Sequence, residues 1–288
     1  MADVRTVLAP NAGPMTLDGT NTYVLSGVAG ASVIIDPGPD DADHLAILAT
    51  SGPALVLITH HHADHTEASS AIHRMTGAPV RALDPAYCIG GDPLTDGELI
   101  YAAGVRIRVV ATPGHTADSV CLLLPDGGAV LTGDTILGRG STVIVGGDGS
   151  LGEYLHSLES LRELGNLTVL PGHGPHLPSL AEACTRLLDL RQQRLSEVRA
   201  VLARLGVEGV QNTKTATTGV ARTGSAAAGQ VSSRAFPLEL VAQVTDTVYP
   251  DVDPRIRFAA EHSVHAQLEF LLTTTTKTTP TCTTPPRD

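Results

Sequence analysis

The chain has 288 residues, enough for one large hydrophobic core and a small additional domain. Charged residues make up 17% of it, and no apolar run approaches the roughly 20 residues that span a bilayer, which argues against a membrane segment. The formal net charge of −11 argues against general attraction to nucleic acid phosphates. The amino terminus lacks the basic and apolar stretches of a secretory signal, and the four cysteines form no CxxC pair, so we expect a cytoplasmic protein with reduced thiols.

The predicted elements alternate between strands and helices over the first 170 residues. Apolar runs rich in Val, Ile and Leu predict strands, and apolar residues at helical spacing predict helices. In chain order we first expect strands at 22–25 and 32–36, a helix at about 40–50 and a strand at 54–59. A helix at about 65–76 and an extended segment at 79–82 follow. The last predicted elements of this part are strands at 105–110, 122–124 and 129–131, a helix at 150–164 and a strand at 167–170. This alternation is typical of an α/β fold.

The composition changes beyond residue 178. Apolar residues at helical spacing predict one long helix, followed by a stretch rich in Gly, Ala, Ser and Thr and by two shorter helices at about 237–249 and 254–272. We therefore expect an α/β domain at 1–178, a long connecting helix at 179–205, a low-complexity insertion or linker at 206–234, a small helical appendage at 235–272 and a disordered tail at 273–288.

Four of the predicted strands end at a loop that carries histidine or aspartate. The strand at 54–59 leads directly into the pattern H-x-H-x-D-H at residues 60–65. The other three loops carry one such residue each: His115, Asp134 and His173. Loops at strand ends are where α/β proteins usually place chemistry on a rigid scaffold, so we expect these residues to meet.

The H-x-H-x-D-H spacing has a geometric interpretation as a metal site. On an extended loop, His60 and His62 point the same way and can bind one metal ion, whereas Asp64 and His65 project from the first turn of a helix toward a second ion. Imidazole and carboxylate groups are suitable ligands for zinc, and two zinc ions need about six or seven ligands. The remaining ligands are expected to be His115, Asp134 and His173. Asp134 has two oxygens and can bridge the pair.

Two alternatives compete with this interpretation, namely a solvated histidine-rich loop and a single structural metal. Further candidates lie outside the ligand set. Asp36 ends a predicted strand, where it could accept a hydrogen bond from a ligand histidine or simply form a turn. The expected rim of the site, where substrate would be held, consists of Asn21, Arg139 and His176. Arg106 and Arg108 could join Arg139 beside the metals to hold a phosphate.

These motifs resemble the metallo-β-lactamase superfamily across residues 15–178. The matching segments are GTNTY at 19–23, THHHADH at 59–65, PGHT at 113–116, GDTILG at 133–138 and LPGHGP at 170–175. The resemblance implies a four-layered αββα sandwich with a catalytic domain at 1–178 and the metals at one edge. It is strongest to the branch of β-lactamase-like protein 2 and glyoxalase II, and residues 249–272 are similar to that branch's small winged-helix-like appendage.

The resemblance implies a binuclear zinc hydrolase in which a metal-bridging hydroxide attacks the substrate and Asp64 and Asp134 take part in catalysis. We expect a small thioester or ester as the substrate. The second hypothesis is a single-strand endoribonuclease, although the acidic appendage and the 3% aromatic content disfavour RNA binding. A third hypothesis is a non-catalytic, regulatory metal-binding module. The sequence does not indicate an oligomeric state.

Overall fold

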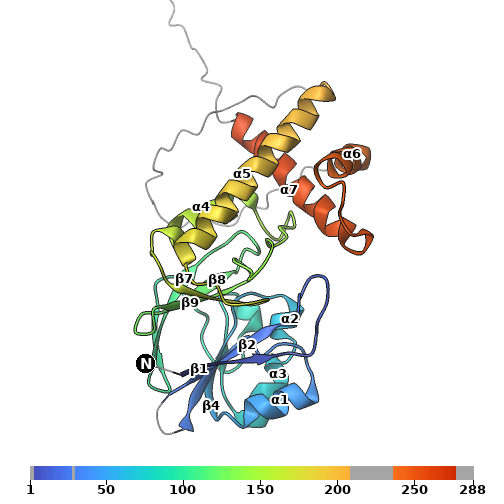
Figure 1. Ribbon diagram of the computed structural model, residues 1–288. Coiled ribbons are helices and arrows are strands. Elements are labelled where there is room, and N and C mark those ends of the chain that lie inside the picture. Colours follow the sequence, from blue (N-terminus) through green and yellow to red (C-terminus); the bar gives the residue numbers. More distant parts are fainter. Residues whose placement is uncertain (1–2, 28–29, 208–235, 277–288) are drawn as a thin grey trace, which may run out of the picture.

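The structure is a computed structural model that describes residues 3–27, 30–207 and 236–276. Two five-stranded sheets face each other, and helices cover the outer face of each, so the layers run α, β, β, α (Figure 1). This is the four-layered sandwich that the sequence predicts. Beyond the sandwich, a long helix extends outward and carries two further helices (Figure 1).

Both sheets are mixed. The first sheet has the strand order β1 (Asp3–Leu8), β2 (Asn21–Ser26), β3 (Ser32–Ile35), β4 (Pro53–Leu57) and β5 (Val80–Arg81). The second has the order β10 (Thr168–Pro171), β9 (Ala129–Gly133), β8 (Val120–Leu124), β7 (Val105–Ala111) and β6 (Leu99–Ala102). β3, β4 and β5 are parallel, as are β9 and β10, whereas the other neighbours are antiparallel.

Alternating side chains along each strand supply two separate cores. In β2, Tyr23 and Leu25 face the second sheet, while Val24 packs with the outer helices α1 (Ala42–Ala49) and α3 (Ser69–Thr76). Because successive side chains of a strand point to opposite faces, a wholly apolar strand can serve both layers. This explains why these strands read as continuous apolar runs in the sequence.

The helices on the second sheet connect the sandwich to the carboxyl-terminal part of the chain. α4 (Leu151–Arg162) and α5 (Leu180–Arg204) share one hydrophobic core with the outer face of the second sheet. α6 (Leu238–Val248) and α7 (Arg257–Thr276) add to that core from the other side of α5. The appendage is therefore packed against the connecting helix rather than tethered at a distance.

The structure differs from the predicted elements in several places. The helix expected at 65–76 is two helices, α2 (Ala63–Thr66) and α3, and the strands β1 and β6 were not predicted. α7 continues to Thr276, four residues into the expected tail, and residues 277–288 lie outside the described part. The expected insertion lies almost wholly outside it as well, and residues 236–276 contain helices but no strand.

None of the helices in the three described ranges is both long enough and apolar enough to cross a membrane.

Candidate metal centre

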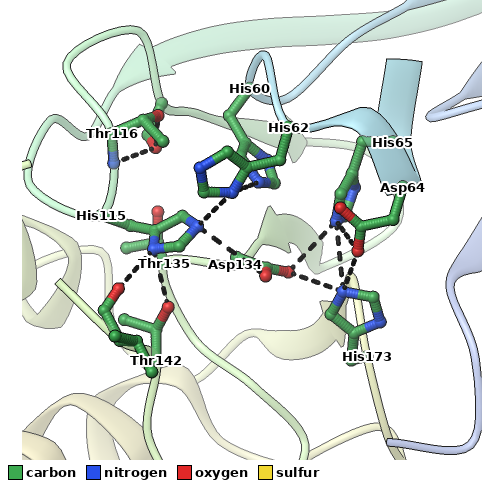
Figure 2. A network of polar contacts seen from close by, with 12 residues as sticks. His60, His62, Asp64, His65, His115, Thr116, Asp134, Thr135, Thr142 and His173 are labelled. Atoms are coloured by element: carbon green, nitrogen blue, oxygen red, sulfur yellow. Dashed lines mark hydrogen bonds and ion pairs between the residues drawn. The ribbon is translucent and has the colours of Figure 1, made fainter. Parts of the chain in front are cut away.

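The H-x-H-x-D-H segment and the three other strand ends meet at one edge of the sandwich. β4 leads into His60, and α2 starts directly after His62. β7, β9 and β10 end just before His115, Asp134 and His173 respectively. Figure 2 shows that the seven predicted ligands converge from these four loops. The first sheet supplies four of them and the second sheet supplies three, so the centre lies across both sheets.

Three imidazoles form one group of converging donors, which we call the histidine cluster: His60, His62 and His115. The Nδ1 atom of His62 lies 3.2 Å from Nε2 of His60 and 3.1 Å from Nε2 of His115. These three donor atoms lie within 4.8 Å of one another and could hold one metal ion.

A second group, which we call the carboxylate cluster, consists of Asp64, His65 and His173. Oδ2 of Asp64 lies 3.0 Å from Nε2 of His173 and 3.6 Å from Nε2 of His65. The two imidazole nitrogens are 3.3 Å apart. Both histidines are fully buried, while the Asp64 side chain is 29% exposed. This cluster could hold a second ion.

Asp134 lies between the two clusters and presents one oxygen to each (Figure 2). Its Oδ1 atom is 3.4 Å from Nε2 of His65 and 3.5 Å from Nε2 of His173, in the carboxylate cluster. Its Oδ2 atom is 3.8 Å from Nε2 of His115, in the histidine cluster. Among the described residues, the buried Oδ1 atom has no hydrogen-bond partner. A buried carboxylate oxygen in that situation is costly unless a cation accompanies it.

The outward-facing nitrogens of three donor histidines contact oxygen acceptors. Nδ1 of His65 lies 2.8 Å from Oδ2 of Asp36, Nδ1 of His115 lies 2.8 Å from the backbone oxygen of Val143, and Nδ1 of His173 lies 3.1 Å from that of Gly19. Carbonyl and carboxylate oxygens only accept, so each Nδ1 carries the proton. The Nε2 lone pairs therefore point into the centre, as in metal-binding histidines.

The separations between the inward nitrogens fit a shared cation. With Nδ1 donating outward in both rings, the Nε2 atoms of His65 and His173 face each other at 3.3 Å, an approach that needs a proton or a metal cation between them. Two nitrogens bound tetrahedrally to one zinc ion at about 2.0–2.1 Å would themselves be about 3.3–3.4 Å apart. The donor set and its spacing thus suit zinc or a similar divalent metal.

Burial controls the protonation of the histidine cluster. It lowers the pKa of His60 well below its usual value and lowers that of His115. Burial alone would raise the pKa of Asp134, but the charges of His173 and His65 outweigh it and hold that pKa well below its usual value. The imidazoles of His60 and His115 are therefore held neutral beside an ionised Asp134, the state in which these groups bind metals.

The carboxylate cluster has the opposite tendency. Burial alone would lower the pKa of His65, but the charges of Asp36 and Asp134 outweigh it and raise that pKa well above its usual value. The charge of Asp134 likewise overcomes burial and raises the pKa of His173. A site that attracts protons in this way attracts a metal cation by the same field.

One glycine leaves room for the centre. A Cβ atom on Gly172 would lie 2.6 Å from Oδ1 of Asp134 and 2.8 Å from Cε1 of His65, closer than Cβ atoms approach other groups. Any side chain at this position would displace two of the donors. The motif P-G-H at 171–173 therefore needs its glycine for space.

Two aspartates that sequence reasoning missed surround the middle histidine of the motif. His61 points away from both clusters, as its alternation predicts, and its Nδ1 lies 2.8 Å from Oδ1 of Asp118. Oδ2 of Asp148 lies 3.3 Å from Nε2 of His62 and 3.5 Å from Nε2 of His61. Asp148 thus gives His62 a partner on its outer side.

The expected rim residues have other contacts. Asn21 is 6% exposed, and its amide donates to the backbone oxygens of Pro171 and Gly174, so it fixes the loop of His173 instead of lining an opening. Arg139 forms a two-pronged ion pair with Asp18 on the surface. His176 lies against the ring of Tyr23, with centroids 5.8 Å apart.

Comparison with known proteins agrees with the fold. The model of the metallo-beta-lactamase superfamily matches residues 15–173. The chain is 34% identical over 206 residues to an atrochrysone carboxyl ACP thioesterase of Aspergillus fumigatus, covering 68% of this chain and 64% of that protein. It is 32% identical over 216 residues to a beta-lactamase-like protein 2 homolog of Caenorhabditis elegans, covering 69% and 70% respectively.

Among solved structures, a metallo-beta-lactamase family protein from Thermus thermophilus superposes with a TM-score of 0.68 at 21% identity, covering 93% of this chain and 92% of that one. At that identity the likeness shows the fold. The family match covers more than half of the chain, so the protein belongs to the metallo-β-lactamase superfamily of metal-dependent hydrolases. Its relatives include proteins named as a thioesterase and as a β-lactamase-like protein 2 homolog.

Proposed function

We propose that this protein is a hydrolase that holds two zinc ions and cleaves small thioesters or esters. The carrying observation is that Asp134 presents its two oxygens to two separate donor clusters. The proposed ligands are the seven predicted ones: His60, His62, Asp64, His65, His115, Asp134 and His173. We further propose that residues 1–178 form the catalytic domain, 179–205 a connecting helix and 235–272 an appendage, in a cytoplasmic protein.

When bound, zinc ions act as Lewis acids that polarise a carbonyl group and bring the pKa of water toward neutrality. None of the seven proposed ligands is a serine or a cysteine, and burial raises the pKa of Cys121, in β8, to about 11, which makes it a poor nucleophile. We assign Asp64 the proton transfer because its carboxylate is partly exposed while the histidines beside it are buried. Asp64 would accept a proton from the water whose oxygen bonds to the carbonyl carbon, and would pass that proton to the thiolate or alkoxide that leaves as the carbon–sulfur or carbon–oxygen bond breaks.

The distribution of arginines supports a small substrate over RNA. Arg106 lies at the start of β7, away from His115, and pairs with Asp126. Arg139 pairs with Asp18, and in the appendage Arg255 pairs with Asp253. A carboxylate beside each guanidinium reduces the net positive charge that these sites present to a phosphate. The thioesterase among the relatives points to the same class of substrate.

The test compares a panel of acyl thioesters with single-stranded RNA at low salt, which favours RNA binding. We expect metal-dependent thioester turnover to be the faster reaction, with two zinc ions per chain by elemental analysis. His62→Ala protein is the control for contaminating nuclease. RNA cleavage that this variant lacks, together with no thioester turnover, would reverse the ranking. Tight metal binding without either activity would support the third hypothesis, a non-catalytic, regulatory metal-binding module.

A further inference from the structure

A buried arginine on α5 contacts the loop that meets His115. Arg191 is 4% exposed, and its Nη2 atom donates to the backbone oxygen of Thr142 at 2.6 Å. Its guanidinium carbon lies 5.1 Å from the centre of the Tyr154 ring. Across residues 3–27, 30–207 and 236–276, no carboxylate forms an ion pair with it, and its buried Nε atom has no hydrogen-bond partner.

Stability alone does not account for this side chain. Burying a guanidinium without a counter-ion carries a desolvation penalty, and an apolar side chain of similar volume would fill the same space without it. The face of the Tyr154 ring compensates the charge only in part. The arginine therefore differs from an apolar residue at this position in its hydrogen bond to the backbone oxygen of Thr142.

That oxygen belongs to the loop that orients His115. The hydroxyl of Thr142 lies 2.9 Å from Nδ1 of His115 (Figure 2). The backbone oxygen of Val143 lies 2.8 Å from the same nitrogen. Thr142 and Val143 share one peptide plane, and that plane is rigid. That plane contains the Thr142 oxygen and the Cα atoms of both residues, so holding the oxygen restrains the two points from which the Thr142 hydroxyl and the Val143 carbonyl project toward His115.

We propose that Arg191 is a positioning residue for the metal ion of the histidine cluster. By holding the loop from α5, it fixes the ring of His115 so that Nε2 faces His60 and His62, and it thereby sets the affinity of that cluster. The proposal rests on the proposed function, because it requires a cation at the cluster. It also assigns the connecting helix a direct part in forming the metal centre.

The same helix offers a matched control one turn away. Arg194 is 30% exposed in its side chain, pairs with Glu197 and donates to the backbone oxygen of Val248. Its guanidinium lies 4.9 Å from the centre of the Tyr249 ring. It therefore makes the same kinds of contact as Arg191 but toward α6, away from the metal centre.

The experiment measures stepwise zinc affinities by competition with a chelator for the wild-type protein, Arg191→Met and Arg194→Met. We expect Arg191→Met to lower the affinity for one of the two zinc ions about 10–100-fold, which is the usual effect of removing a group that orients a ligand. The affinity for the other zinc ion should not change. Arg194→Met should match the wild type. In a His115→Ala background, Arg191→Met should cause no further loss, since the ring that it positions is gone.

Unchanged affinities for both zinc ions in folded Arg191→Met protein would overturn the proposal, as would an equal loss in Arg194→Met. If Arg191→Met does not fold, Arg191→Gln replaces the charge with a shorter polar group that no longer reaches the Thr142 oxygen, and the same selective loss is expected. A wild-type protein that binds fewer than two zinc ions would instead count against the proposed function, so the two failures are distinguishable.

Discussion

The two donor clusters of the metal centre have similar geometry but different electrostatics. The histidine cluster contains only imidazoles, and the outer nitrogens of His60 and His115 meet neutral oxygens. The carboxylate cluster contains Asp64 and is supported by a second carboxylate, Asp36, behind His65. The field of two carboxylates favours a cation more than neutral oxygens do. We infer that the carboxylate cluster binds its ion more tightly and fills first.

Asp134→Asn should have the largest effect, because Asp134 is the one group shared by both clusters. An amide keeps the shape of the side chain but loses its charge and one of its two acceptor oxygens. We expect no more than one zinc ion per chain and a loss of turnover greater than the roughly 10–100-fold typical of an indirect partner. Elemental analysis and kinetics measure this, and unchanged circular dichroism serves as the folding control. A variant that retained both metals and full turnover would show that Asp134 does not join the clusters.

Asp36→Asn should weaken the carboxylate cluster selectively. Asp36 has a φ of 51°, in the left-handed region that asparagine adopts readily, so the substitution changes the charge without straining the backbone. The carboxylate behind His65 is lost, and we expect the tighter zinc ion to bind about 10–100-fold more weakly. The affinity of the histidine cluster should change little. Equal weakening of both ions in a chelator titration would contradict the distinction between the clusters.

Asp148→Asn tests the outer side of the histidine cluster and should have the smallest effect. The carboxylate is 32% exposed and lies 3.3 Å from Nε2 of His62, so solvent screens the interaction. We expect the weaker zinc ion to lose roughly two- to fivefold in affinity, within the range of exposed ion pairs. The same titration measures it. A loss as large as that of Asp36→Asn would mean that both clusters depend equally on carboxylates behind their histidines.

Sequence periodicity predicted most of the elements that carry the centre, because strands buried on both faces read as continuous apolar runs. It did not predict the break between α2 and α3. There, the backbone N–H of Ala68 donates to the oxygen of Gly38, and the oxygen of His65 accepts from the N–H of Gly38. These bonds to a distant loop replace helical ones, and nothing local to residues 65–76 announces them.

The donor residues were easier to predict than their partners. H-x-H-x-D-H places four candidate donors within six residues, and the other three each follow a predicted strand, so both features can be recognised in the sequence. Thr142, Val143 and Asp148 lie in an irregular loop between β9 and α4, where the contact is made partly by backbone oxygens that any residue could supply. The contacts of the Asn21 amide with Pro171 and Gly174 could not be predicted from the sequence, because they depend on how the loop of His173 folds back.

The spread of the donors along the chain has a consequence for biosynthesis. The segment at 60–65 is synthesised with four candidate donors, two for each cluster, long before β10 delivers His173. β10 is the last of the five strands of the second sheet to be synthesised, and domains fold as units. Neither cluster is therefore complete until the second sheet has formed, so tight metal retention would report that the two sheets have closed.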